Sequence, residues 1–129
     1  MSDPQLSPHP LPNGSLPPSP LPPGFEALEP VVSYWAVATT EGRLRARAEA
    51  SMDEIRAFYD AMLPLADAAM NHVDAYGLAD LSPERTCLAA LVLSLAQAAV
   101  AVEIHGAPRA PGTPYPNSLR VLRGAPPLG

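Results

Sequence analysis

Seventeen consecutive residues without a charged side chain, Thr86 to Val102, constrain the fold of this chain more than any other feature. A helix that is apolar all round is normally buried all round, so this run needs covering surface on every side. A membrane-spanning helix needs about 20 mostly apolar residues. Because the run is shorter than that and is diluted by serine, glutamine and alanine, we interpret it as the buried helix of a soluble protein, with no membrane span.

Proline divides the chain into three parts. Ten of the 18 prolines lie within residues 1–30, and six more lie between Pro108 and Pro127. Proline removes a backbone donor and holds the chain extended, so no packed core is expected in these regions. We therefore predict a disordered proline-rich tail at 1–30, a helical domain at 31–105 and a proline-rich arm at 106–129. A domain of this size is near the limit at which one core is stable alone, which favours cover by another chain.

The tail contains a leucine at every fifth position, each followed by proline directly or one residue later: Leu6, Leu11, Leu16 and Leu21. Two interpretations remain open. The segment is either a low-complexity linker or an extended peptide whose leucines dock into shallow pockets, as preformed polyproline segments do.

The middle of the chain has the spacing of helices. From Leu44 to Tyr76 the apolar residues recur in steps of three and four, which predicts a helix from about Arg43 that ends near Gly77. Aspartates seven residues apart, from Asp53 to Asp74, are expected to form a solvated face. Ser51 followed by Glu54 forms a capping box, an alternative start for the helix, and Pro64 predicts a kink. Charged and apolar residues alternate from 43 to 50, which leaves a β-hairpin as the less favoured alternative.

A second helix is expected from Pro83 to His105. Ser82 can cap it, and Gly106 is a natural stop. The short connection between the two helices predicts antiparallel neighbours. The predicted fold is therefore mainly α, an antiparallel helical hairpin with long proline-rich extended termini. Val31 to Thr40 is rich in β-branched and aromatic residues and is expected to form a short β segment or an extended docking segment.

Composition argues against several classes of function. The net charge is −5 and the eight basic residues, all arginine, are scattered, so we do not expect a nucleic-acid partner. No export signal is visible, and a cytoplasmic location is expected. We find no nucleophile motif, nucleotide loop or cluster of metal ligands, and predict no catalytic residue, cofactor or metal. The single cysteine, Cys87, is interpreted as a small core residue.

The helix expected at 83–105 has more apolar surface than one neighbouring helix can cover. A broad strip that includes Leu88 and Leu91 faces the first helix, whereas Leu93, Val100 and Ile104 point the opposite way. A flank of small residues between them suits close approach by another helix. Together with two aromatic anchors, these positions form the predicted partner interface: Trp35, Ala90, Leu93, Ser94, Gln97, Val100, Ala101, Ile104 and Tyr115.

The function expected from these features is that of a small non-catalytic accessory or scaffold subunit. It would bind another protein subunit, or form a homo-oligomer, through its apolar helix. The alternative is a small dimeric helical enzyme or ligand-binding domain whose pocket is lined by His72, Tyr76, Gln97 and His105. A buried glutamine on an apolar helix needs a hydrogen-bonding partner, which gives that alternative some support.

Overall fold

The computed structural model describes residues 21–76, 82–112, 124 and 127–129, and this part of the chain is mainly helical. No β-strand occurs among the described residues. The elements in chain order are the 3₁₀ turn η1 (Glu26–Leu28), α1 (Glu29–Trp35), α2 (Thr40–Glu49), α3 (Met52–Met62), the 3₁₀ turn η2 (Leu63–Leu65), α4 (Ala66–Asp74), α5 (Pro83–Ala99) and the π-helical turn η4 (Val100–His105).

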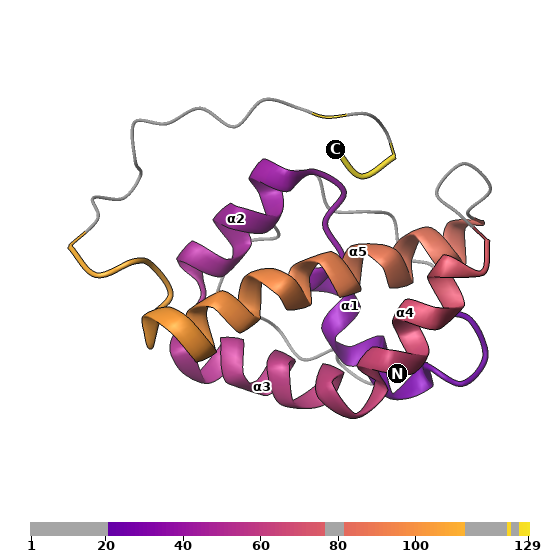
Figure 1. The fold of residues 1–129 in the computed structure, drawn as a ribbon, viewed down its shortest axis with the longest axis horizontal. Helices are drawn as coiled ribbons and strands as arrows, with labels where there is room; N and C mark the ends of the chain where they lie inside the picture. The colour runs from indigo at the N-terminus through magenta and orange to yellow at the C-terminus, as the bar shows by residue number, and fades with distance from the viewer. Residues whose placement is uncertain (1–20, 77–81, 113–123, 125–126) are drawn as a thin grey trace, which may run out of the picture.

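The uncharged run forms most of α5 and the first three residues of η4, and the other helices are arranged around α5 (Figure 1). Helix α5 packs against α1, α2, α3 and α4, and η4 packs against α3. The sequence predicts a hairpin in which one neighbouring helix covers one strip. Four neighbours from the same chain instead share the cover of α5, so much of its apolar surface is buried without a partner.

The ends of the helices follow local capping chemistry. The Ser51 hydroxyl accepts from the Glu54 backbone N–H at 3.1 Å, and the Glu54 carboxylate accepts from the Ser51 N–H at 2.8 Å. This capping box starts a new helix, so the segment predicted as one helix from Arg43 is divided into α2, α3 and α4, with η2 at the predicted kink around Pro64. The second predicted helix is confirmed from Pro83 to His105, with Ser82 as its cap and Gly106 in the left-handed conformation at its end.

The prediction of a β segment at Val31–Thr40 is wrong, because residues 29–35 form helix α1. Pro30 suits the first turn of a helix. The aromatic residues that suggested a strand are used for packing: the Trp35 ring stacks on Phe58, with 4.5 Å between the ring centres. The Tyr34 hydroxyl donates to the backbone carbonyl of Ala46 at 2.8 Å, which joins α1 to α2. Tertiary packing thus outweighs the β propensity of the segment.

The core extends beyond the predicted boundary at residue 30. Leu21, Phe25 and Leu28 are buried with the helices, so the last ten residues of the predicted tail belong to the folded part of the chain. Leu128, from the predicted C-terminal arm, is also buried in this core. Proline-rich composition predicted extended backbone here, but it did not reveal that leucines and a phenylalanine between the prolines would be buried.

Candidate functional site

Four members of the predicted partner interface are covered by the chain itself. Trp35, Ala90, Ser94 and Ala101 are each buried, with at most 5% of the residue exposed. The Ser94 hydroxyl donates to the Trp35 carbonyl at 2.6 Å, which places the small-residue flank of α5 directly against α1. The close approach that the small residues predicted is therefore made by a helix of the same chain. This corrects the predicted interface, from which these four side chains are removed.

Gln97 has its hydrogen-bonding partner within the chain as well. Its side-chain oxygen accepts from the Arg47 guanidinium at 3.1 Å, which joins α5 to α2. Gln97 therefore does not need a ligand to satisfy its side-chain oxygen. His72 and Tyr76 do lie together, with ring centres 5.5 Å apart, but the hollow that they line includes neither Gln97 nor His105.

Part of the predicted interface is exposed. Leu93 is 40% exposed and Ile104 is 74% exposed, whereas Val100 is partly buried. These residues belong to the strip that was expected to point away from the first helix. Tyr115 lies outside the described residues, so the structure gives no information on that member. Two large apolar side chains of α5 and η4 are thus left at the surface by the chain's own packing.

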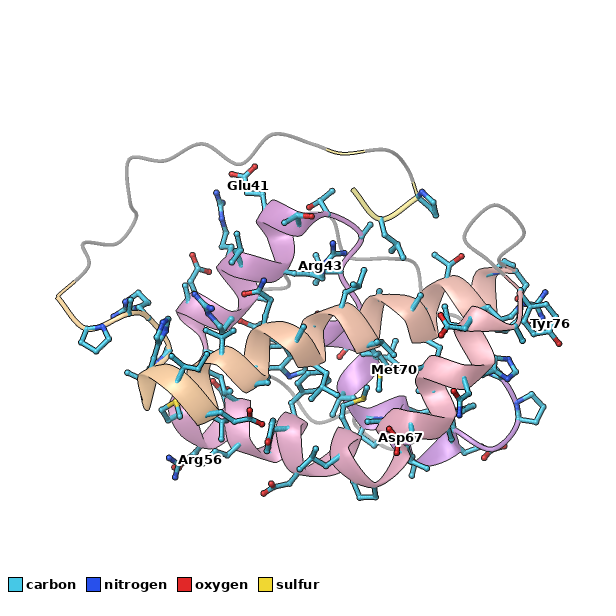
Figure 2. All side chains as sticks on the ribbon, viewed as in Figure 1. Glu41, Arg43, Arg56, Asp67, Met70 and Tyr76 are labelled. Atoms are coloured by element: carbon cyan, nitrogen blue, oxygen red, sulfur yellow. The ribbon has the colours of Figure 1, made fainter. Side chains whose placement is uncertain are left out.

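Leu93 lines an apolar groove between α4 and α5. The groove has a volume of about 420 Å³, and its walls are Met70, Val73 and Asp74 of α4, Ala89, Val92 and Leu93 of α5, and Pro127, Leu128 and Gly129. Figure 2 labels Met70 on α4, beside α5. Met70 is 41% exposed, so both helices present a large apolar side chain that is only partly covered. Sequence analysis identified Leu93 but missed Met70.

One wall of the groove is held in place by a buried arginine. The Arg43 guanidinium donates to the carbonyls of Val37 at 2.8 Å and Leu128 at 2.7 Å, and to the Thr40 hydroxyl at 3.1 Å. The Thr40 backbone N–H donates to the Gly129 carbonyl at 3.2 Å. Burial lowers the pKa of Arg43 because it disfavours the charged form. The guanidinium therefore fixes Leu128 beside the groove.

The lining of the groove is mostly apolar. Asp74 is the one charged side chain among its lining residues. Cys87 is buried in the core, and burial raises the pKa of its thiol, which keeps it in the unreactive protonated form. Among the described residues, no group of three or more histidine, cysteine or carboxylate side chains could hold a metal ion.

Within the described part of the chain, Pro83–His105 is the one helix long and apolar enough to cross a membrane by length and composition. The central helix of a soluble protein passes the same test. Comparison of the chain with known protein families, with curated proteins and with solved structures found no match.

Proposed function

We propose that the chain is a small non-catalytic accessory or scaffold subunit that binds a protein partner through the groove between α4 and α5. In this proposal α4, which lies in the last part of the first predicted helix, and α5, which lies in the second, are the parts of the predicted hairpin that form the binding site. The observation that carries the proposal is the position of Met70 and Leu93. Two large apolar side chains, each about 40% exposed, line the same hollow from facing helices.

The binding energy would come from completing the burial of these side chains. Full burial of a leucine or methionine contributes about 1.5–3 kcal/mol, and both are already more than half covered. The groove alone therefore supports modest affinity. Ile104 lies eleven residues beyond Leu93, about 16 Å further along the helix. An interface that covers both sites would add the burial of Ile104, the most exposed of the large apolar side chains described.

The test is photo-crosslinking in the cells that produce the protein. A photoreactive amino acid is placed at Leu93, in the groove, and in a second protein at Ala68, which is exposed on α4 about 200° around the helix from Met70 and does not line the groove. We expect a discrete adduct with another protein from position 93 and little from position 68. The substitution Met70→Asp should reduce the yield from position 93 because it places a charge in the apolar wall.

Equal yields from the two positions would contradict the proposal. An adduct that consists of two copies of this chain would identify the partner as a homo-oligomer, whereas an adduct of another mass would indicate a different subunit.

A second candidate function is supported by the size of the groove. Its volume of about 420 Å³ falls within the range of small-molecule sites, about 300–1,000 Å³. This keeps the ligand-binding alternative, with the groove in place of the pocket at His72. Native mass spectrometry of the purified chain distinguishes the two functions. A bound small molecule that is lost in the Leu93→Asp variant would favour the ligand site, and a ligand-free chain would favour the protein interface.

A further inference from the structure

The N-terminal sequence contains one short motif twice. Residues 10–14 read Pro-Leu-Pro-Asn-Gly, and residues 20–24 read Pro-Leu-Pro-Pro-Gly. The two copies share the proline, leucine, proline and glycine positions and are offset by ten residues. The structure describes the second copy from Leu21 onward, so it shows how a motif of this kind is used.

The second copy is an anchored turn. Leu21 is 6% exposed, and Pro22 is buried beside it. The Phe25 backbone N–H donates to the Pro22 carbonyl at 3.2 Å, and Gly24 adopts a positive φ of 98°. A tight turn of this kind favours proline followed by a residue that tolerates positive φ, usually glycine or asparagine. The leucine therefore acts as the anchor, and the glycine turns the chain back toward the helices.

The first copy has the same chemical features. Leu11 is flanked by prolines, as Leu21 is, and Asn13 and Gly14 are both favoured turn residues. Residues 4–20 contain no aspartate, glutamate, lysine or arginine, so burial of this segment requires no ion pair. A second anchored turn needs an apolar site on the folded part of the chain, and the groove at Met70 and Leu93 is such a site.

The groove lies within reach of the first copy. Leu21 lines a hollow with His72 of α4 and with Tyr76, two residues beyond the end of that helix, and α4 also contributes Met70 and Val73 to the groove. A helix with its side chains is about 10–12 Å across. Ten residues of extended polyproline span about 31 Å, so the chain between Leu21 and Leu11 is long enough to pass around α4.

We propose that the groove between α4 and α5 also receives Leu11 of the same chain, so that the N-terminal segment competes with the partner. The inference rests on the proposed function of the groove. A tethered segment has a high effective concentration, so it can occupy a site whose intrinsic affinity is modest. The partner would then have to displace Leu11, and binding would be weaker than the free groove allows.

The test is the rate of disulfide formation in the full chain. Leu11→Cys is combined with Met70→Cys in one protein and with Asn71→Cys in the control. Asn71 is exposed on the same helix, has almost the same tether length and does not line the groove. With oxidised glutathione, we expect an intrachain disulfide to form at least ten times faster at position 70 than at position 71, as followed by peptide mass spectrometry.

Equal rates at positions 70 and 71 would overturn the proposal, and a disulfide between two chains at position 70 would overturn it in favour of exchange between copies.

A second measurement uses the dye anilinonaphthalene sulfonate. The Leu11→Asp variant should raise its fluorescence several-fold by opening the groove, and the additional change Leu93→Asp should remove the rise. If the disulfide rates are equal while position 93 still crosslinks to a partner, only this inference fails. If the disulfide forms rapidly but no adduct with another protein appears, the partner function fails instead.

Discussion

The two flanks of the helix formed by α5 and η4 look equally suited to a partner in the sequence but differ in the structure. The small-residue flank at Ala90, Ser94 and Ala101 is buried against the chain's own helices. The larger residues Leu93 and Ile104 are left partly or mostly exposed. Small residues therefore indicated close helix packing correctly, but they did not indicate which chain supplies the neighbouring helix.

The difference between the flanks follows from geometry. Alanine and serine allow two helix backbones to approach closely, so a neighbouring helix can pack directly against that flank. Here that helix is α1, which the Ser94 hydroxyl contacts through the Trp35 carbonyl. The bulkier flank is covered less closely, and a hollow beside Leu93 remains open, with residues 127–129 forming part of its wall.

Enlarging a residue on the buried flank should have the largest effect. Ser94→Leu loses the hydrogen bond to Trp35 and overpacks the contact with α1, and we expect it to lower the free energy of unfolding by about 3 kcal/mol. The control is Ala96→Leu, on the exposed side of the same helix, which should change it by less than about 0.5 kcal/mol. Urea denaturation measures both. Similar values for the two variants would show that the flanks do not differ.

The next effect concerns the wall of the groove. Arg43→Met removes the donors to the carbonyls of Val37 and Leu128, which leaves buried acceptors unpaired, and we expect a loss of about 2 kcal/mol in urea denaturation. The matched control is Arg45→Met, whose guanidinium makes an exposed pair with Glu41 at 3.4 Å. Such a pair on a helix contributes about 0.2–0.5 kcal/mol. If Arg45→Met lowers the free energy of unfolding as much as Arg43→Met does, the hydrogen bond from Arg43 to Leu128 does not hold the wall of the groove in place.

A smaller effect is expected at the far end of the exposed strip, where the Tyr59 hydroxyl donates to the Glu103 carboxylate. This hydrogen bond raises the pKa of Tyr59 above its ordinary value of 10.0, with smaller contributions from burial and from nearby carboxylates. The contribution to stability is therefore present below pH 10 and is lost as the pH rises through the higher pKa of the folded state. In thermal denaturation from pH 8 to pH 11, the Tyr59→Phe variant should lose less stability than the native chain, and identical profiles would contradict this.

Much of the helical structure could be predicted because its signals are local. The capping box at Ser51, the cap at Ser82 and the stop at Gly106 each depend on a few neighbouring residues. Helix α1 was missed because Tyr34 and Trp35 have strand propensity, and only their contacts with Ala46 and Phe58 favour the helix. Those partners lie 12 and 23 residues away, and no local pattern identifies them.

The candidate site was only half predictable for the same reason. Leu93 was identified because helical periodicity places it opposite the first buried strip. Met70 falls between the apolar residues that recur in steps of three and four and the polar face of its helix. Its exposure therefore depends on how α4 lies against α5. Arg43, Arg45 and Arg47 alternate with apolar residues, and the sequence does not show that Arg43 is buried whereas Arg45 is not. Contacts with residues 127–129, more than 80 residues away, decide that difference.

The most direct test of the two-sided character of α5 compares the same substitution at two nearby leucines. Leu91 is fully buried and Leu93 is 40% exposed. In urea denaturation we expect Leu91→Ala to lower the free energy of unfolding by about 2–5 kcal/mol. Leu93→Ala should lower it by less than about 1 kcal/mol, because much of that side chain is already in water. The account would be contradicted if both substitutions lowered the free energy of unfolding by the same large amount and the loss for Leu93→Ala increased with protein concentration. That result would show that Leu93 is already buried in a stable oligomer.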